Sequence, residues 1–216
     1  MDPLEEIYPP FGLRISCGEL ELRHVREADV PAIARLVRSG IYHPAALPFL
    51  TRWAEAPGDQ LARNTLQFYW NAFAESGPQA WHLALAARHQ GRLVGVQDMS
   101  ARDFAVVRSI ETGSWLARQH QGRGIGRLMR QAVCALGFDV LGAVEMSSGF
   151  FEGNQRSAGV SRAVGYRPNG TRRMLHPDGD SARLEHRVVL RPEDFVRPPH
   201  PVQVSGEGPL LRFLGL

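Results

Sequence analysis

The run from Gln121 to Gly126 (QGRGIG) suits phosphate binding, because glycines let a backbone close around an anion. Strand-like residues 110–117 precede it, and apolar residues follow it with the spacing of one helix face. These are Ile125, Leu128, Met129, Ala132, Val133 and Leu136. A glycine-rich loop at a helix start gathers several N–H groups at the positive end of the helix dipole. Arg123 and Arg127 add positive charge, so the pattern indicates a ligand that carries a pyrophosphate.

Two common nucleotide-binding loops fit this run poorly. A P-loop ends in lysine and serine or threonine, whereas all 25 Lys+Arg residues of this chain are arginine. A Rossmann fingerprint needs a third glycine or alanine where this chain has Arg127. Glu145 does lie near the spacing of the acidic residue in that fingerprint. A Rossmann-type nucleotide enzyme therefore stays open as a weaker alternative.

The order Gln-x-x-Gly-x-Gly between a strand and a helix resembles the pyrophosphate loop of the GNAT superfamily of acyl-CoA-dependent N-acyltransferases. Within it, GSWL at 113–116 and NQRSAGVSRAVGY at 154–166 resemble segments of the RimJ/RimL-type branch, and residues 20–29 resemble its opening strand and helix. The resemblance covers about residues 13 to 190. A looser resemblance is to an actinobacterial subgroup that includes succinyl-CoA users, through residues 48–49, 64–66, 70 and 95–97.

This resemblance implies an α/β fold with a mixed, mostly antiparallel sheet flanked by helices. It implies transfer of an acetyl or related acyl group from acyl-CoA, the co-substrate, to a primary amine by direct attack in a ternary complex. A succinyl-CoA-dependent transferase is the alternative, and a non-catalytic acyl-CoA-binding regulatory module is a second one. The acceptor is a small-molecule amine or a protein or peptide amine. The CoA diphosphate would contact Gln121, Gly122, Arg123, Gly124, Ile125, Gly126 and Arg127.

The resemblance also implies roles around the thioester. A main-chain N–H near Leu116 or Ala117 would face the thioester oxygen. Asn154 would contact the pantetheine arm, and Ser157 would protonate the leaving thiolate. A structural alternative is that Asn154 caps a helix in which Ser157 is the third residue.

We take Glu111 as the candidate general base, because it lies on the strand that leads into the loop. Alternation along that strand puts it on the opposite face from Leu116. The rival candidates are Asp98, Asp103, Glu152 and His176. His176 lies at about the position where some members of the RimJ/RimL-type branch, which this chain resembles, carry a glutamate. The histidines and the two cysteines, Cys17 and Cys134, lack metal-ligand spacing, so we expect no metal.

The elements that would position these residues can be predicted from periodicity and turn residues. We expect a helix containing Pro31 and capped by Asp29 or Glu27. The remaining expected elements are a strand at 20–25, a helix at 59–75, a hairpin at 81–99, a strand at 143–146, a helix at 154–164, and strands at 166–173 and 183–190. Residues 1–11 read as a loosely held arm, and 41–57 as a long loop beside the acceptor.

Composition limits the class of protein. With 216 residues, 44% hydrophobic and 22% charged, the chain is typical of a globular protein with one main domain. Its net charge of +3 is spread along the chain, so we expect no nucleic-acid partner. It has no signal-peptide pattern and no apolar run long enough for a bilayer, so we expect a cytoplasmic protein without membrane contact.

The last residues differ in character from the rest. We divide the chain into a GNAT domain at 1–197 and a proline-punctuated apolar tail at 198–216. Residues 202–204 (VQV) could add an edge strand. The large apolar residues Leu210, Leu211, Phe213 and Leu214 should be covered. They would pack in a homo-oligomer interface, across the acceptor groove or onto their own domain.

Overall fold

The computed structural model describes residues 2–42, 48–49 and 51–216. Within those residues, nine strands form one sheet in the order β7-β8-β6-β5-β4-β3-β2-β1-β9. They are β1 (Arg14–Cys17), β2 (Leu20–His24), β3 (Ala80–His89), β4 (Arg92–Arg102), β5 (Ser109–Leu116), β6 (Glu145–Phe151), β7 (Arg167–Leu175), β8 (Ala182–Leu190) and β9 (Val202–Ser205). β5 and β6 run parallel, and the other neighbouring strands run antiparallel. The predicted mixed, mostly antiparallel sheet is confirmed.

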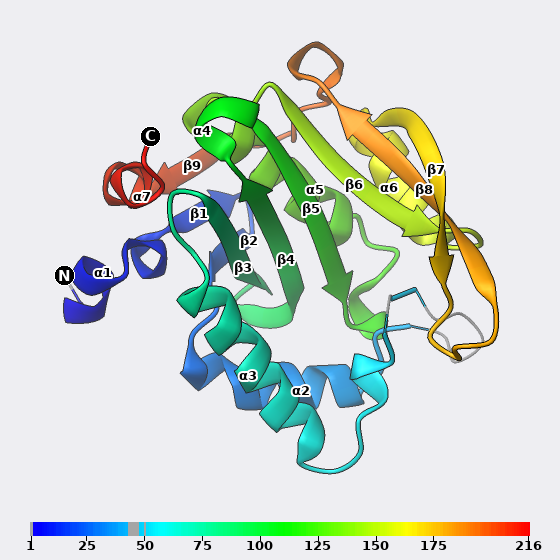
Figure 1. Ribbon diagram of the computed structural model, residues 1–216. Helices are drawn as coiled ribbons and strands as arrows, with labels where there is room; N and C mark the ends of the chain where they lie inside the picture. Colours follow the sequence, from blue (N-terminus) through cyan, green and yellow to red (C-terminus); the bar gives the residue numbers. More distant parts are fainter. Residues whose placement is uncertain (1, 43–47, 50) are drawn as a thin grey trace.

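Helices cover both faces of this sheet (Figure 1). They are α1 (Pro3–Ile7), α2 (Val30–Arg38), α3 (Gln60–Ala74), α4 (Phe104–Val107), α5 (Ile125–Ala135), α6 (Gln155–Val164) and α7 (Glu207–Phe213), with a π-helical turn at Leu136–Val140 extending α5. α2 and α3 pack on one face with Ala84 and Ala86 of β3. α5 and α6 lie on the other face (Figure 1). The sheet therefore separates a layer with α2 and α3 from a layer with α5 and α6.

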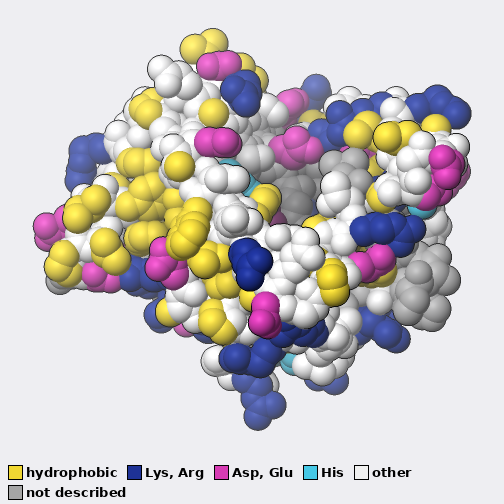
Figure 2. All heavy atoms as spheres, turned by 60° about the horizontal axis from the view of Figure 1, so that its bottom comes forward, with side chains coloured by type: hydrophobic (Ala, Val, Ile, Leu, Met, Phe, Trp, Pro, Cys, Tyr) yellow, Lys and Arg dark blue, Asp and Glu magenta, His cyan; other side chains and the backbone are white. Residues whose placement is uncertain are grey.

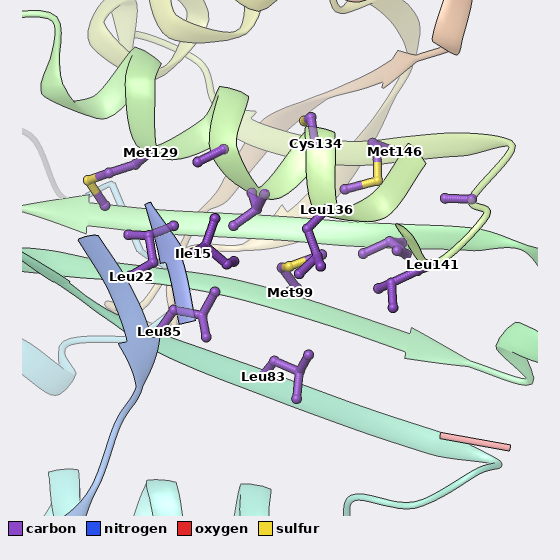
Figure 3. Close-up of a cluster of buried hydrophobic side chains, with 14 of the residues drawn as sticks. Ile15, Leu22, Leu83, Leu85, Met99, Met129, Cys134, Leu136, Leu141 and Met146 are labelled. Carbon is purple, nitrogen blue, oxygen red and sulfur yellow. The ribbon is translucent and has the colours of Figure 1, made fainter. Parts of the chain in front are cut away.

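The main core lies between the sheet and α5. Figure 3 shows Met129 and Leu136 on the helix side and Leu85 and Met99 on the strand side. Met129, Leu136, Leu85 and Met99 each have an exposed fraction of 0%. Full burial of such a side chain contributes about 1.5–3 kcal/mol, so this core anchors α5 firmly under the strands. The apolar helix face predicted from the sequence is the face that packs here.

Most predicted elements are present, with local differences. β5 ends at Leu116, and a 3-10 turn at Arg118–His120 separates it from the glycine loop. Asp29 is the N-cap residue of α2, as predicted, but its side chain makes no capping hydrogen bond to the first turn. It accepts hydrogen bonds from the Arg26 N–H and the Arg88 guanidinium instead.

The N-terminal residues are held in place, so the expectation of a loose arm is wrong. Glu5 of α1 accepts from Arg14 at 2.8 Å and from Arg26 at 2.8 Å. The ring of Tyr8 lies 5.2 Å from that of Phe213 in α7. The two ends of the chain therefore meet at one side of the molecule (Figure 1).

The C-terminal tail continues the sheet. β9 pairs antiparallel with β1, from Arg14↔Ser205 to Cys17↔Val202, as predicted for an edge strand. In and just after α7, Leu210 and Leu214 have exposed fractions of 0% within this single chain. The tail therefore packs onto its own domain. A homo-oligomer, and a domain boundary between 197 and 198, stay predictions.

Candidate active site

The glycine loop leads directly into α5. Gly124 is the N-cap residue of α5 with a φ of 78°, and Gly122 has a φ of 76°. A Cβ on either residue would meet no atom within 4 Å, so the glycines serve backbone conformation and the space beside them is open. The first N–H groups of a helix lack intrahelical acceptors, so this end of α5 offers donors and a positive dipole to an anion. Arg123 and Arg127 are exposed beside it.

Gln121 holds the loop in position. Its Nε2 donates to the carbonyl oxygens of Leu116 at 2.8 Å and Ile41 at 2.9 Å. Its Oε1 accepts from the guanidinium of Arg156 on α6. The side chain thus ties together the end of β5, the segment after α2, and α6. Its interactions order the loop, and the main chain of the loop is left to face a ligand.

β5 and β6 separate beside this loop. Their parallel pairing runs from Ser109↔Glu145 to Glu111↔Ser147 and ends there, although both strands continue (Figure 1). At the point of divergence, the Ser148 hydroxyl donates to the Thr112 carbonyl oxygen at 2.8 Å. The Thr112 hydroxyl donates to the Ser147 carbonyl oxygen at 3.1 Å. We call the region between the two strands beyond this point the β5–β6 cleft.

The main-chain N–H groups of β5 divide between its two neighbours. The Ala117 N–H donates to the Val94 carbonyl oxygen at 3.0 Å, on the β4 side. Since successive residues of a strand direct their N–H groups to alternate sides, those of Leu116 and Ser114 point into the β5–β6 cleft. Of the two N–H groups predicted from the sequence, that of Leu116 points into the cleft and that of Ala117 does not. The N–H group of Ser114 also points into the cleft.

Asn154 and Ser157 lie at the start of α6. Asn154 is the N-cap residue, and its Oδ1 accepts from the Ser157 N–H at 3.1 Å. The capping interaction expected from the sequence is confirmed. Ser157 is half-buried. Val160, one turn after Ser157, lies near Gly126, since a Cβ on Gly126 would be 3.7 Å from Val160 Cγ2. α6 therefore starts close to the glycine loop.

Glu111 lies on the opposite sheet face from Leu116, as predicted, because Leu116 packs against the core under α5 and Glu111 does not. Its side chain is 53% exposed and pairs with Arg187 of β8 at 2.8 Å. Arg187 also lies 3.6 Å from Glu185. This is the face that α2 and α3 partly cover, and Figure 2 shows that the surface there is hollowed, with acidic side chains at the rim.

Asp98 shares this face with Glu111, because Asp98 pairs with Gly113 and Ser100 pairs with Glu111 across β4 and β5. His82 Nε2 lies 2.8 Å from Asp98 Oδ1. Burial lowers the pKa of His82, but its hydrogen bond and ion pair with Asp98 outweigh burial, so the pKa is raised above its ordinary value. The pair favours an imidazolium beside a carboxylate.

The other candidate bases lie elsewhere. His176 follows β7 in the β7–β8 turn and pairs with Asp178 at 2.8 Å. Asp103 follows β4 at the end of the sheet away from the loop, where it precedes α4. Glu152 follows β6 and lines a hollow of about 350 Å³ with Phe150, His186 and Asn154 at the start of α6. Part of the predicted acceptor loop, residues 43–47 and 50, lies outside the described residues.

Sequence reasoning missed a buried polar cluster at the closed end of the β5–β6 cleft. Arg130 of α5 is 3% exposed, and its Nη1 donates to Ser148 Oγ at 3.0 Å. Its guanidinium carbon lies 5.6 Å from the centre of the Tyr166 ring. The Tyr166 hydroxyl lies 3.2 Å from Thr112 Oγ1 and 3.5 Å from Cys134 Sγ. The sequence held one sign that Arg130 lies near the donor site. Arg130 follows Gly126 of the glycine loop by four residues, so the two share one face of α5.

These features fit coenzyme A. The open loop and the N-terminus of α5 suit a diphosphate, while the N–H groups along the β5–β6 cleft suit an amide-bearing arm. A family profile for the acetyltransferase (GNAT) domain matches residues 19–167. The chain belongs to this family, and it is an acyl-CoA-dependent N-acyltransferase.

Solved structures share the fold. A Mycobacterium smegmatis RimJ in complex with a CoA disulfide is 20% identical, with a TM-score of 0.69 over 93% of this chain and 92% of that one. A RimL ribosomal L7/L12 alpha-N-protein acetyltransferase in complex with coenzyme A is 21% identical, with a TM-score of 0.64 over 80% and 94%. A ribosomal-protein-S5-alanine acetyltransferase from Vibrio fischeri is 15% identical, with a TM-score of 0.64 over 85% and 98%. At these identities the likeness concerns the fold.

In the described part of the chain, none of the helices combines the length and the apolar character that crossing a bilayer requires. No group of three or more His, Cys, Asp or Glu side chains in that part is arranged to hold a metal ion.

Proposed function

We propose that this chain transfers an acyl group from acyl-CoA to a primary amine by direct attack in a ternary complex. The observation that carries the proposal is continuity: the open glycine loop at the start of α5 adjoins the β5–β6 cleft. A ligand with its diphosphate on the loop would extend its arm along the N–H groups of Leu116 and Ser114. When bound, acyl-CoA supplies a thioester carbon activated for attack.

The donor side uses main-chain groups and α6. Gly122 to Gly126 and the start of α5 bind the diphosphate, with Arg123 and Arg127 as mobile counter-charges. Asn154 contacts the arm while it caps α6. An N–H of Leu116 or Ser114 donates to the thioester oxygen, where negative charge develops during attack. Because these donors belong to a strand fixed by the core, they need little reorganisation.

The acceptor side lies across the sheet, on the face that carries Glu111 and Asp98. The amine nitrogen forms a bond to the thioester carbon, the carbon–sulfur bond breaks, and its electron pair goes to sulfur. Glu111 lies three residues, or roughly 10 Å, from Ser114 along β5, so it takes the surplus proton of the amine through a chain of waters and then releases it to solvent. Ser157 gives its hydroxyl proton to the thiolate and regains a proton from water. Asp98, level with Gly113 and paired with His82, is the alternative base.

The acceptor we propose is an amine on a protein or peptide, with a small-molecule amine as the alternative. The named activities of the RimL and Vibrio fischeri structures concern ribosomal proteins. In this chain, the face that carries Glu111, Asp98 and Glu185 offers carboxylates to a cationic amine. The rings of Trp53 and Trp115, 6.1 Å apart, add an apolar wall.

The experiment is a thiol-release assay that crosses acetyl-CoA and succinyl-CoA with peptide, polyamine and aminoglycoside acceptors. Thiol release that depends on one acceptor class supports the proposal. Tight CoA binding with no turnover on any acceptor would favour the non-catalytic module.

Three variants test the roles on the working pair of substrates. Ser157→Ala should lower turnover by about 10²–10⁴-fold with a smaller change in KM for acyl-CoA. Glu111→Gln should lower turnover and alter the pH profile, while Asp98→Asn should have the smaller effect. If Asp98→Asn has the larger effect on the profile, the base is Asp98. Wild-type turnover in Ser157→Ala would leave that residue a helix-start residue only.

A further inference from the structure

Arg130 is a buried cation without a counter-charge. Its exposed fraction is 3%, its Nε is buried without a hydrogen-bond partner, and among the described residues it forms no ion pair with a carboxylate. Arginine stays protonated in proteins, so it cannot escape this position by losing its charge. Holding an unpaired ion away from water costs several kcal/mol.

The neighbours of Arg130 offer only neutral compensation. They are the hydroxyl of Ser148 and the ring face of Tyr166, whose hydroxyl lies 3.5 Å from the Cys134 thiol. Burial raises the pKa of the Cys134 thiol to about 11, and burial also raises the pKa of Tyr166, so neither is an anion near neutral pH. The protein therefore maintains a positive charge here that no described residue around it balances.

The position of this charge relates it to the donor site. Ser148 binds Arg130 and also donates to the Thr112 carbonyl oxygen, at the first residue beyond the β5–β6 pairing. Arg130 is therefore at the closed end of the cleft, on the same side of the sheet as the glycine loop. Two residues of β5, or about 7 Å, separate Thr112 from Ser114.

We propose that Arg130 selects acyl groups that end in a carboxylate, with the four-carbon succinyl group as the best fit. This rests on the proposed function and specifies its donor. With the thioester oxygen at the Ser114 N–H, the terminal carboxylate of a succinyl group lies roughly 4–5 Å beyond the thioester carbon. A charge-assisted hydrogen bond of about 3 Å then spans the remaining distance to the guanidinium. An acetyl group is too short to reach Arg130, so the positive charge of Arg130 keeps no anionic partner.

The test compares succinyl-CoA and acetyl-CoA as donors to one fixed amine. The wild type should have the higher kcat/KM for succinyl-CoA, and Arg130→Met should reduce the succinyl-to-acetyl ratio by about 10- to 150-fold. Turnover of acetyl-CoA should fall less than turnover of succinyl-CoA. Arg130→Lys, which keeps the charge, should retain part of the preference. Cys134→Ala is the matched control, because it alters the packing at Tyr166 one turn along α5 without changing charge.

Each outcome bears on a separate claim. An unchanged ratio in Arg130→Met, or a wild type that prefers acetyl-CoA, overturns the selection by Arg130 and leaves acyl transfer intact. Equal loss with both donors means that Arg130 supports the fold or the chemistry in general, which also overturns it. If CoA does not bind the wild type, the proposed function fails first. Should Arg130→Met not fold, the ratio in Arg130→Lys and in Ser148→Ala, which removes the hydrogen-bond partner of Arg130, decides the same question.

Discussion

Mild acid should destabilise this protein through His24. His24 is 2% exposed on β2, where its Nδ1 donates to the Val25 carbonyl oxygen at 3.0 Å. The rings of Tyr8, Phe11 and Phe73 lie 5.1–5.7 Å from its centre, and its Nε2 is buried without a partner. Burial lowers the pKa of His24 from its ordinary value of 6.5 to about 4.

The direction in which pH changes the stability follows from proton linkage. Because the pKa is lower in the folded state, the unfolded chain binds the proton first as the pH falls. The contribution of neutral His24 to stability is therefore present above about pH 6.5 and is lost between there and about pH 4. For these two pKa values, the loss from pH 7.5 to pH 5 amounts to about 2 kcal/mol, approaching a limit of about 3 kcal/mol in stronger acid.

The measurement is urea unfolding, followed by tryptophan fluorescence at pH 7.5 and pH 5. His24→Asn keeps a donor near Val25 but cannot titrate, so its pH-dependent loss should be smaller than that of the wild type by about 2 kcal/mol. His24→Asn starts from a lower stability because it is smaller, and only the difference between the two pH values is used. Equal pH dependence in wild type and His24→Asn would refute the reasoning.

Three other perturbations probe the loop, the β4–β5 contact and the tail. Gly124→Asp should abolish CoA binding in calorimetry, whereas the uncharged Gly124→Asn should retain part of it; equal affinities would remove the loop from the diphosphate site. Gly95→Ala should lower the free energy of unfolding because its Cβ would collide with the Trp115 carbonyl oxygen, while Gly113→Ala, whose Cβ meets nothing within 4 Å, should be mild. Deleting 201–216 removes the fully buried Leu210 and Leu214, at about 1.5–3 kcal/mol each, so unchanged urea stability would show that the tail does not support the sheet.

The parts of the fold that were predicted from sequence depend on short-range patterns. The apolar spacing after Gly124 identified α5, and alternation with turn residues identified the β3–β4 hairpin. The strand potential of residues 202–204 was visible, and β9 pairs as expected. The N-terminal arm was misjudged, because its stability comes from Glu5 and Tyr8 meeting residues that lie far along the chain.

The functional charges were harder to predict, since their surroundings come from distant segments. A charged residue is exposed by default, and nothing near Arg130 in the sequence shows that β6 and Tyr166 close over it. The Glu111–Arg187 pair joins β5 to β8, which are not neighbours in the sheet. Sequence patterns identified Glu111 as a candidate general base, but they did not identify Arg187 as its ion-pair partner.

That pair also shows how one small residue of β6 affects the acceptor face. Gly149 faces Arg187 across the β6–β8 pairing, and a Cβ on Gly149 would lie 2.5 Å from Glu185 Oε1 and 3.1 Å from Arg187 Nη1. Because Gly149 has no side chain, Arg187 can extend over β6 to Glu111. The Glu185 carboxylate can then lie where a Cβ of Gly149 would otherwise be. A larger residue would displace Arg187 and leave Glu111 without its counter-charge. The proposed acceptor face is thus organised by β8 through a gap in β6, while the proposed donor face is organised by α5 and α6. β5 and β6 diverge between these two faces, and we propose that an amine from one face reaches a thioester from the other at this point.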